Sequence, residues 1–89
     1  MNARATKRFW ACFESLPLEI QTKARRCYRL WSDDPHHPGL HFKQIHRHQP
    51  IYSARIGIGW RALAVQEGDT FIWFWIGSHA EYDRIISTL

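Results

Sequence analysis

The segment Thr70-Phe71-Ile72-Trp73-Phe74-Trp75-Ile76 decides the fold of this 89-residue chain. It is apolar from its second residue onward, it is rich in aromatic side chains, and it is far too short to cross a bilayer as a helix. A short run with aromatic residues at both odd and even positions is typical of a strand that is covered on both faces. We therefore expect this segment to be the central strand of a sheet, ended by Gly77-Ser78.

Three more strands are expected before the central one. Residues 60–66 are joined to it by Glu67-Gly68-Asp69, a sequence typical of a β-hairpin turn. Residues 52–58 alternate apolar side chains with small or polar ones, which indicates one buried face. Residues 40–47 form the remaining expected strand, with mixed faces. The expected sheet is therefore small and mainly antiparallel.

The first third of the chain has a helical period instead. Apolar residues recur at helical spacing from about Thr6 to Ser15. A second helix is expected after Pro17, a residue that fits a first helical turn, and it should end before Pro35. Residues 80–86 complete the order ααββββα. This order predicts a single α+β domain over residues 1–89, with a helical hairpin packed on the sheet and a short C-terminal helix.

Positive charge is concentrated in the middle of the chain. Residues 35–66 contain four Lys/Arg, five of the six histidines and no acid, whereas the other eight cations are balanced by eight acids. The net charge of +4 therefore belongs to this acid-free segment. Such segregation favours an acidic partner, namely nucleic acid, an acidic protein or an anionic membrane surface, although solubility alone is the simpler alternative.

Several function classes are disfavoured. Cys12 and Cys27 form no CxxC pair, and we interpret them as reduced, buried thiols that fit a reducing cytoplasm. The basic start of the chain is not followed by an apolar run, so neither a signal peptide nor a membrane span is expected. The histidines of the acid-free segment match no HExxH motif and have no cysteine nearby. We therefore expect no metal and no cofactor.

This order of elements, with five short motifs in the same order, resembles the RelE/ParE superfamily of toxins from bacterial type II toxin–antitoxin systems. The motifs are Leu16-Pro17 and residues 34–43, 52–57, 60–63 and 75–83, which together span nearly the whole chain. The resemblance implies a small cytoplasmic toxin that is neutralised by an antitoxin encoded beside it. In this superfamily the RelE-like branch cleaves mRNA, often on the ribosome, and the ParE-like branch poisons DNA gyrase.

Two residues are the first candidates for RNA chemistry. Cleavage without metal needs a base for the ribose 2′-hydroxyl, cations for the phosphate and an acid for the departing 5′-oxygen. His79 follows Gly77-Ser78 and resembles an essential His in the Gly-Thr-His segment of some RelE-like nucleases; the alternative is that it only packs or caps the last helix. Arg61 matches an Arg that holds the scissile phosphate in RelE-like toxins. Its alternative is a structural ion pair with Glu81 or Asp83.

The supporting candidates are mostly cations of the acid-free segment. Lys43, Arg47 and Arg55 are expected to bind phosphate, with solvated surface residues as the alternative. Tyr82 is a candidate to stack on a base or to donate its hydroxyl, or else it packs the last helix. His46, or else His48, is the candidate for the second proton transfer, and the alternative is that both are plain surface residues.

These residues favour a metal-independent mRNA endoribonuclease that leaves a 2′,3′-cyclic phosphate and inhibits translation. The expected partners are an antitoxin and mRNA. Two other functions stay open at this stage: inhibition of DNA gyrase, which needs no general acid or base, and a toxin-like module that binds a partner without catalysis.

Overall fold

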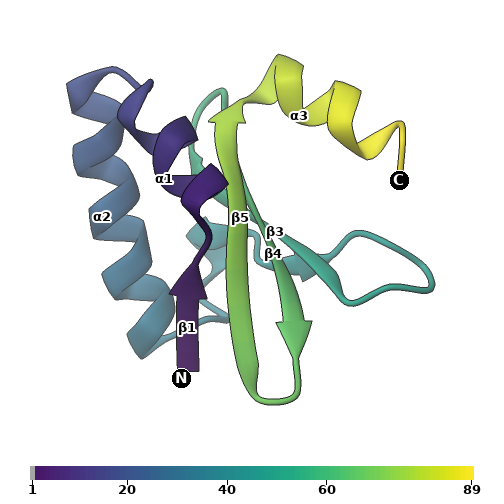
Figure 1. Cartoon of the computed structure of the whole chain (residues 1–89). Coiled ribbons are helices and arrows are strands. Elements are labelled where there is room, and N and C mark those ends of the chain that lie inside the picture. Colours follow the sequence, from purple (N-terminus) through teal and green to yellow (C-terminus); the bar gives the residue numbers. More distant parts are fainter. Residues whose placement is uncertain (1) are drawn as a thin grey trace.

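Five strands form one sheet in the order β1-β5-β4-β3-β2 (Figure 1). The structure is a computed structural model that describes residues 2–89. All neighbouring strands are antiparallel except β1, which runs parallel to β5, so β5 has a strand on each side as its sequence predicts. The bounds are β1 (Asn2–Ala5), β2 (Lys43–Gln44), β3 (Ile51–Gly57), β4 (Trp60–Glu67) and β5 (Thr70–Ser78).

Helices cover both faces of this sheet. Helices α1 (Lys7–Glu14) and α2 (Leu18–Asp33) form a hairpin on one face, and α3 (His79–Ile86) lies on the other (Figure 1). Thr6 caps α1 by accepting a hydrogen bond from the N–H of Phe9. The expected α+β architecture, with its hairpin and short C-terminal helix, is confirmed. None of the helices formed by residues 2–89 has the length and hydropathy of a membrane span.

An aromatic cluster holds the hairpin on the sheet. Trp31 of α2 is 1% exposed, and its ring meets those of Phe42, Phe71 and Trp73 edge to face at centroid distances of 5.6, 5.5 and 5.2 Å. Such edge-to-face contacts stabilise a core beyond the area that they bury. The central strand therefore supplies two of the three rings that anchor α2.

A β-bulge in β5 sends its last two tryptophans to opposite faces. Leu63 pairs with Trp75 but Ala64 pairs with Trp73, so Phe74 has no partner on β4. As a result Trp73 packs under the hairpin, whereas Trp75 packs with Leu63 and Tyr82 under α3. Strict alternation would have put both tryptophans on one face.

The sheet differs from the expected one at its two edges and at the end of β5. The parallel strand β1 was not expected, and the strand expected over residues 40–47 contracts to Lys43–Gln44. It is short because Leu40 ends a 3-10 turn, His41 is left-handed at φ 45°, and the Gln44 side chain donates to the carbonyls of His46 and Gln49. Gly77 and Ser78 do not break β5 but form its last two residues.

Both cysteines are free thiols. Burial raises the pKa of the Cys27 thiol, against the opposing effect of Arg26 and Lys23. The Cys27 Sγ lies 3.5 Å from the carbonyl oxygen of Ile56, to which it donates.

Candidate functional site

The sheet face beneath α3 carries two rows of side chains in register. Residues paired across neighbouring strands share a face, and residues two apart on one strand share it too. One row contains Lys43, Ser53, Leu63 and Trp75, and the next contains Arg55, Arg61 and Gly77. The two arginines predicted from the sequence therefore lie together on the face that α3 partly covers.

Arg55 and Arg61 are directly opposite each other on β3 and β4. Like charges in this position destabilise a sheet. No carboxylate of residues 2–89 lies within ion-pair distance of either arginine, and the expected alternative pair of Arg61 with Glu81 or Asp83 is not formed. Arg61 instead donates from Nη1 to the carbonyl of Trp60 at 3.1 Å. The pair is a concentrated positive charge of the kind that binds phosphate.

Tyr82 connects α3 to this arginine pair. Its ring centroid lies 6.0 Å from the Arg61 Cζ, and its hydroxyl lies 3.4 Å from the Ser53 Oγ, to which it donates. The side chain is only 8% exposed, so little of its ring is open to a base. Tyr82 thus packs the helix, the simpler of its two expected roles, and also contacts Arg61 from above.

His79 is the first residue of α3 and lies at the edge of the same site. Its Nδ1 is 3.1 Å from Asp83 Oδ2, and about half of each side chain is exposed. Its ring centroid is 5.7 Å from that of Tyr82. The His79 N–H donates to the carbonyl of Gly59 at 2.7 Å, which ties the start of α3 to the β3–β4 turn. Tyr82 therefore connects His79 to Arg61, and Arg55 lies opposite Arg61 on the neighbouring strand.

The cap of α3 fixes where the helix begins and therefore where His79 lies. Ser78 accepts a hydrogen bond from the N–H of Glu81, and the Glu81 carboxylate accepts one from the Ser78 hydroxyl. This reciprocal arrangement is close to a capping box. Glu81 is thus occupied by the helix cap. The carboxylate partner of His79 is instead Asp83, which the sequence analysis did not predict, although a spacing of four residues on a helix indicates such a contact.

The other predicted residues lie farther along the sheet or outside it. Lys43 is exposed on β2, opposite Ser53. Arg47 and His46 lie in the loop between β2 and β3, where His46 Nδ1 accepts from the N–H groups of His48 and Gln49. Among residues 2–89, no hydrogen bond, ion pair or ring contact joins the His46 or Arg47 side chain to His79, Tyr82 or Arg61. Their roles stay predictions.

Metal ligands do not gather in the described part of the chain. Within residues 2–89 there is no group of three His, Cys, Asp or Glu side chains that could surround one ion.

Gly77 leaves room for the Trp75 ring, which lies where a side chain at position 77 would begin, and its replacement makes the first testable prediction. A Cβ at this position would lie 2.6 Å from Trp75 Cζ2. We expect Gly77→Ala to lower the free energy of unfolding by about 1–3 kcal/mol, because a packed ring must move. Urea unfolding of Gly77→Ala and wild type measures this difference in the free energy of unfolding. Trp75→Phe removes the clashing atom, so the double variant should lose less stability than the two single losses combined; simple additivity would contradict the clash.

Comparisons with known proteins agree with this architecture. Comparison with curated proteins finds no match. Among solved structures, YafQ from E. coli BL21(DE3) has a TM-score of 0.73 at 9% identity, covering 91% of this chain and 96% of that one. A chain of the RelB–RelE antitoxin–toxin complex from Methanococcus jannaschii has a TM-score of 0.72 at 20% identity, with 90% and 95% covered. The YoeB/ParE toxin from Agrobacterium tumefaciens has a TM-score of 0.67 at 15% identity, with 89% and 99% covered.

These TM-scores establish a shared fold. A family model described as the ParE-like toxin domain matches residues 18–84, which include α2, the strands β2 to β5 and most of α3. The chain therefore belongs to the ParE-like toxin domain family.

Proposed function

We propose that this chain is the toxin of a type II toxin–antitoxin system and that it cleaves mRNA without a metal, which inhibits translation. The observation that carries the proposal is the Arg55–Arg61 pair, two arginines at directly opposite strand positions without a carboxylate, which Tyr82 connects to His79. A sheet gains nothing from such a pair, and features that cost stability are expected where function requires them.

The proposed reaction needs no bound cofactor. The ribose 2′-oxygen attacks the adjacent phosphorus and loses its proton, while the bond from phosphorus to the 5′-oxygen breaks and that oxygen gains a proton. The products are a 2′,3′-cyclic phosphate and a 5′-hydroxyl end. Arg55 and Arg61 hold the phosphate as negative charge builds on its oxygens, because planar guanidinium groups donate two parallel hydrogen bonds.

His79 is the proposed proton-transfer group. Its Nδ1 faces Asp83, so the carboxylate orients the ring and Nε2 is left for the RNA. Tyr82 positions Arg61. Lys43 and Arg47 extend the basic track for the RNA backbone, and His46 stays the sequence-based candidate for the second proton transfer.

We propose an antitoxin as the protein partner. The structural neighbours include the RelB–RelE antitoxin–toxin complex from Methanococcus jannaschii and a RelE–RelB complex from Pyrococcus horikoshii. Their chains share the fold of this one, which supports the same kind of partner here.

A second candidate function is the poisoning of DNA gyrase, which the match to the ParE-like family model favours. It requires neither His79 nor a phosphate next to it. It predicts DNA breaks with intact mRNA when the chain is induced.

One induction experiment separates these functions. We expect wild-type induction to stop growth and to produce new mRNA ends with a 5′-hydroxyl within minutes, detected by RNA end mapping. The double variant Arg55→Ala/Arg61→Ala should produce none, and Arg84→Ala, which removes an exposed arginine of α3, should behave as wild type. Double-strand DNA breaks with intact mRNA would instead support gyrase poisoning, and normal growth on induction would support a module that only binds a partner.

A further inference from the structure

A cavity of about 270 Å³ lies between the end of α1, the end of β5 and the first turn of α3. Buried apolar side chains form its floor, namely Leu16, Trp75 and Ile76. The exposed polar residues Ser15 and Glu81 stand at its rim. Pockets for drug-sized ligands measure about 300–1,000 Å³, so the occupant that fits this cavity is a single planar ring system.

The cavity adjoins the candidate RNA site along β5. Gly77 lines the cavity, and it is the residue that pairs with Arg61 on β4. Ser78 lines it too and directly precedes His79 in the sequence. A base that enters the cavity therefore belongs to a nucleotide next to the phosphate that Arg61 is proposed to hold.

The charge of the cavity is opposite to that of the arginine pair. Glu81 is the only charged residue of the described chain that lines it. One Glu81 oxygen accepts from the Ser78 hydroxyl, but a carboxylate has about four lone-pair sites, so acceptor sites are left over. A carboxylate repels phosphate, yet it accepts hydrogen bonds from the N–H groups of a base. A base, with apolar faces and a polar edge, matches this apolar floor and polar rim.

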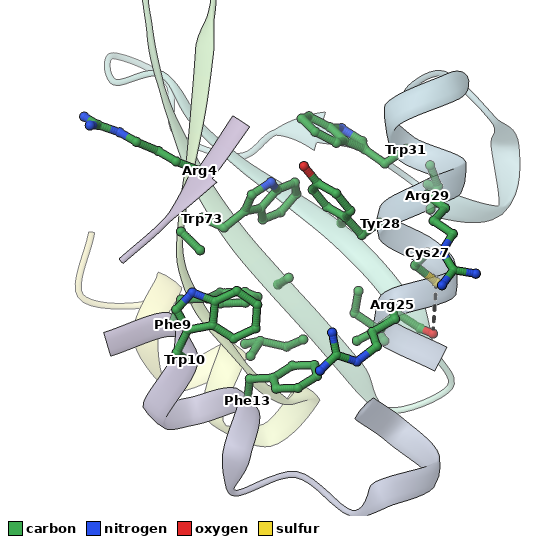
Figure 2. A pocket seen from close by; sticks show the side chains of 17 residues that line it. Arg4, Phe9, Trp10, Phe13, Arg25, Cys27, Tyr28, Arg29, Trp31 and Trp73 are labelled. Carbon is green, nitrogen blue, oxygen red and sulfur yellow. Dashed lines mark hydrogen bonds between the residues drawn. The ribbon is translucent and has the colours of Figure 1, made fainter. Parts of the chain in front are cut away.

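A larger groove, between α1, α2 and the strands, has a different lining (Figure 2). Ala54 lines this groove, so it lies on the sheet face opposite its neighbour Arg55. Three arginines and no acidic residue of residues 2–89 line it, and Figure 2 shows Arg25 reaching over it from α2. The groove offers no carboxylate to the edge of a base, so the smaller cavity is the better base site.

We propose that this cavity binds the base of a nucleotide that flanks the scissile phosphate, and that Glu81 makes it select guanine. The Watson–Crick edge of guanine carries two adjacent donors, the ring N–H and the 2-amino group, which fit two carboxylate oxygens as a guanidinium does. Uracil offers one N–H between two carbonyl oxygens, which the carboxylate repels. Trp60, half-buried on the cavity wall, stacks on the base. The inference rests on the proposed RNA cleavage.

RNA that cannot be cleaved tests the cavity apart from the chemistry. Oligonucleotides with a 2′-O-methyl group on every ribose lack the nucleophile, and fluorescence anisotropy measures their dissociation constants. We expect a uridine oligonucleotide with one central guanosine to bind at least about tenfold more tightly than uridine alone, the usual discrimination of a bidentate contact. Inosine, which lacks only the 2-amino group, should lose part of this preference.

The substitution Glu81→Gln tests the selection itself. Glutamine serves in a capping box as glutamate does, so the start of α3 and the position of His79 should be kept. An amide combines an acceptor with a donor, which fits the 6-amino group and ring nitrogen of adenine, so the preference should change from guanine to adenine. Glu14→Gln, on α1 outside the cavity, is the matched control and should still prefer guanine.

Replacing Trp60 tests the stacking contact. Trp60→Leu removes the aromatic face, so it should weaken binding by about tenfold and leave the preference for guanine. Trp60→Phe restores a ring and should recover most of the affinity. Circular dichroism confirms that each variant is folded.

Other outcomes would overturn the proposal. These are equal affinity for the guanosine and uridine oligonucleotides, a Glu81→Gln variant that still prefers guanine, or loss of the preference in Glu14→Gln. Single-turnover cleavage of the unmodified oligonucleotides separates this inference from the proposed function. Cleavage without a base preference would refute the base site alone, whereas guanine-dependent binding without cleavage would refute only the proposed chemistry.

Discussion

Replacing Arg61 with alanine should slow RNA cleavage by about 10²–10³-fold, the usual cost of removing one group that stabilises charge in the transition state. The same change should leave the fold as stable as before, or more stable by about 0.2–1 kcal/mol, because it relieves the repulsion between Arg61 and Arg55. No carboxylate of residues 2–89 forms an ion pair with Arg61, so its removal leaves no negative charge unpaired. A loss of activity with a gain of stability is the signature of a functional residue.

Two matched changes make this prediction specific. Arg61→Lys keeps the charge but loses the planar donor fork, so cleavage should be only partly restored. Arg84→Ala removes an arginine from the exposed side of α3 and should cleave normally. The measurements are single-turnover cleavage of an RNA oligonucleotide and urea unfolding of the same samples. If Arg61→Ala unfolded more easily and still cleaved RNA, Arg61 would be structural.

The sequence predicted those elements that have local signals. The hairpin helices follow from helical spacing, the β4–β5 turn from Glu67-Gly68-Asp69, and β3 from alternation. Strand β1 has four residues and pairs with Thr70–Trp73, far along the chain, so no local pattern marks it. The shortening of β2 depends on hydrogen bonds that the Gln44 side chain donates and the His46 side chain accepts. A hydrophobic pattern does not predict such bonds.

The site was predicted as a set of residues but not as an arrangement. That Arg55 faces Arg61 depends on the register of β3 with β4, which only the paired strands reveal. The burial of Trp75 beneath Tyr82 depends on the bulge at Phe74. The groove is a tertiary feature as well, because its space comes from alanines on α2, β3 and β4 that meet only in the folded chain.

The cations of the acid-free segment are divided between one face of the sheet and the β2–β3 loop. Arg55, Arg61 and Lys43 belong to the face of the candidate RNA site, but Arg47 and His46 lie in the β2–β3 loop. The groove is lined by arginines from outside this segment, on β1 and α2. A count of charge along the chain therefore locates one basic surface and misses the second.

Replacing His79 with alanine should reduce RNA cleavage by about 10²–10⁴-fold, the range expected when a general acid or base is removed. His79 is about half exposed and Ser78 caps α3, so the fold should not depend on the imidazole. The pH–rate profile of the variant should lose one limb, because the proposed general acid or base is gone. A merely structural role for His79 would not change the shape of that profile.

Asp83 and His46 separate the roles of the imidazoles. Asp83→Asn keeps the size of the side chain but removes its charge, so cleavage should slow less than in His79→Ala, since the imidazole is still present. His46→Ala should slow cleavage only if His46 transfers the second proton; otherwise it should loosen the loop in which Nδ1 holds two N–H groups. His36→Ala, in an exposed turn, is the matched control. Cleavage that survives His79→Ala with an unchanged pH profile would remove His79 from the mechanism, and the arginine pair would then serve binding alone.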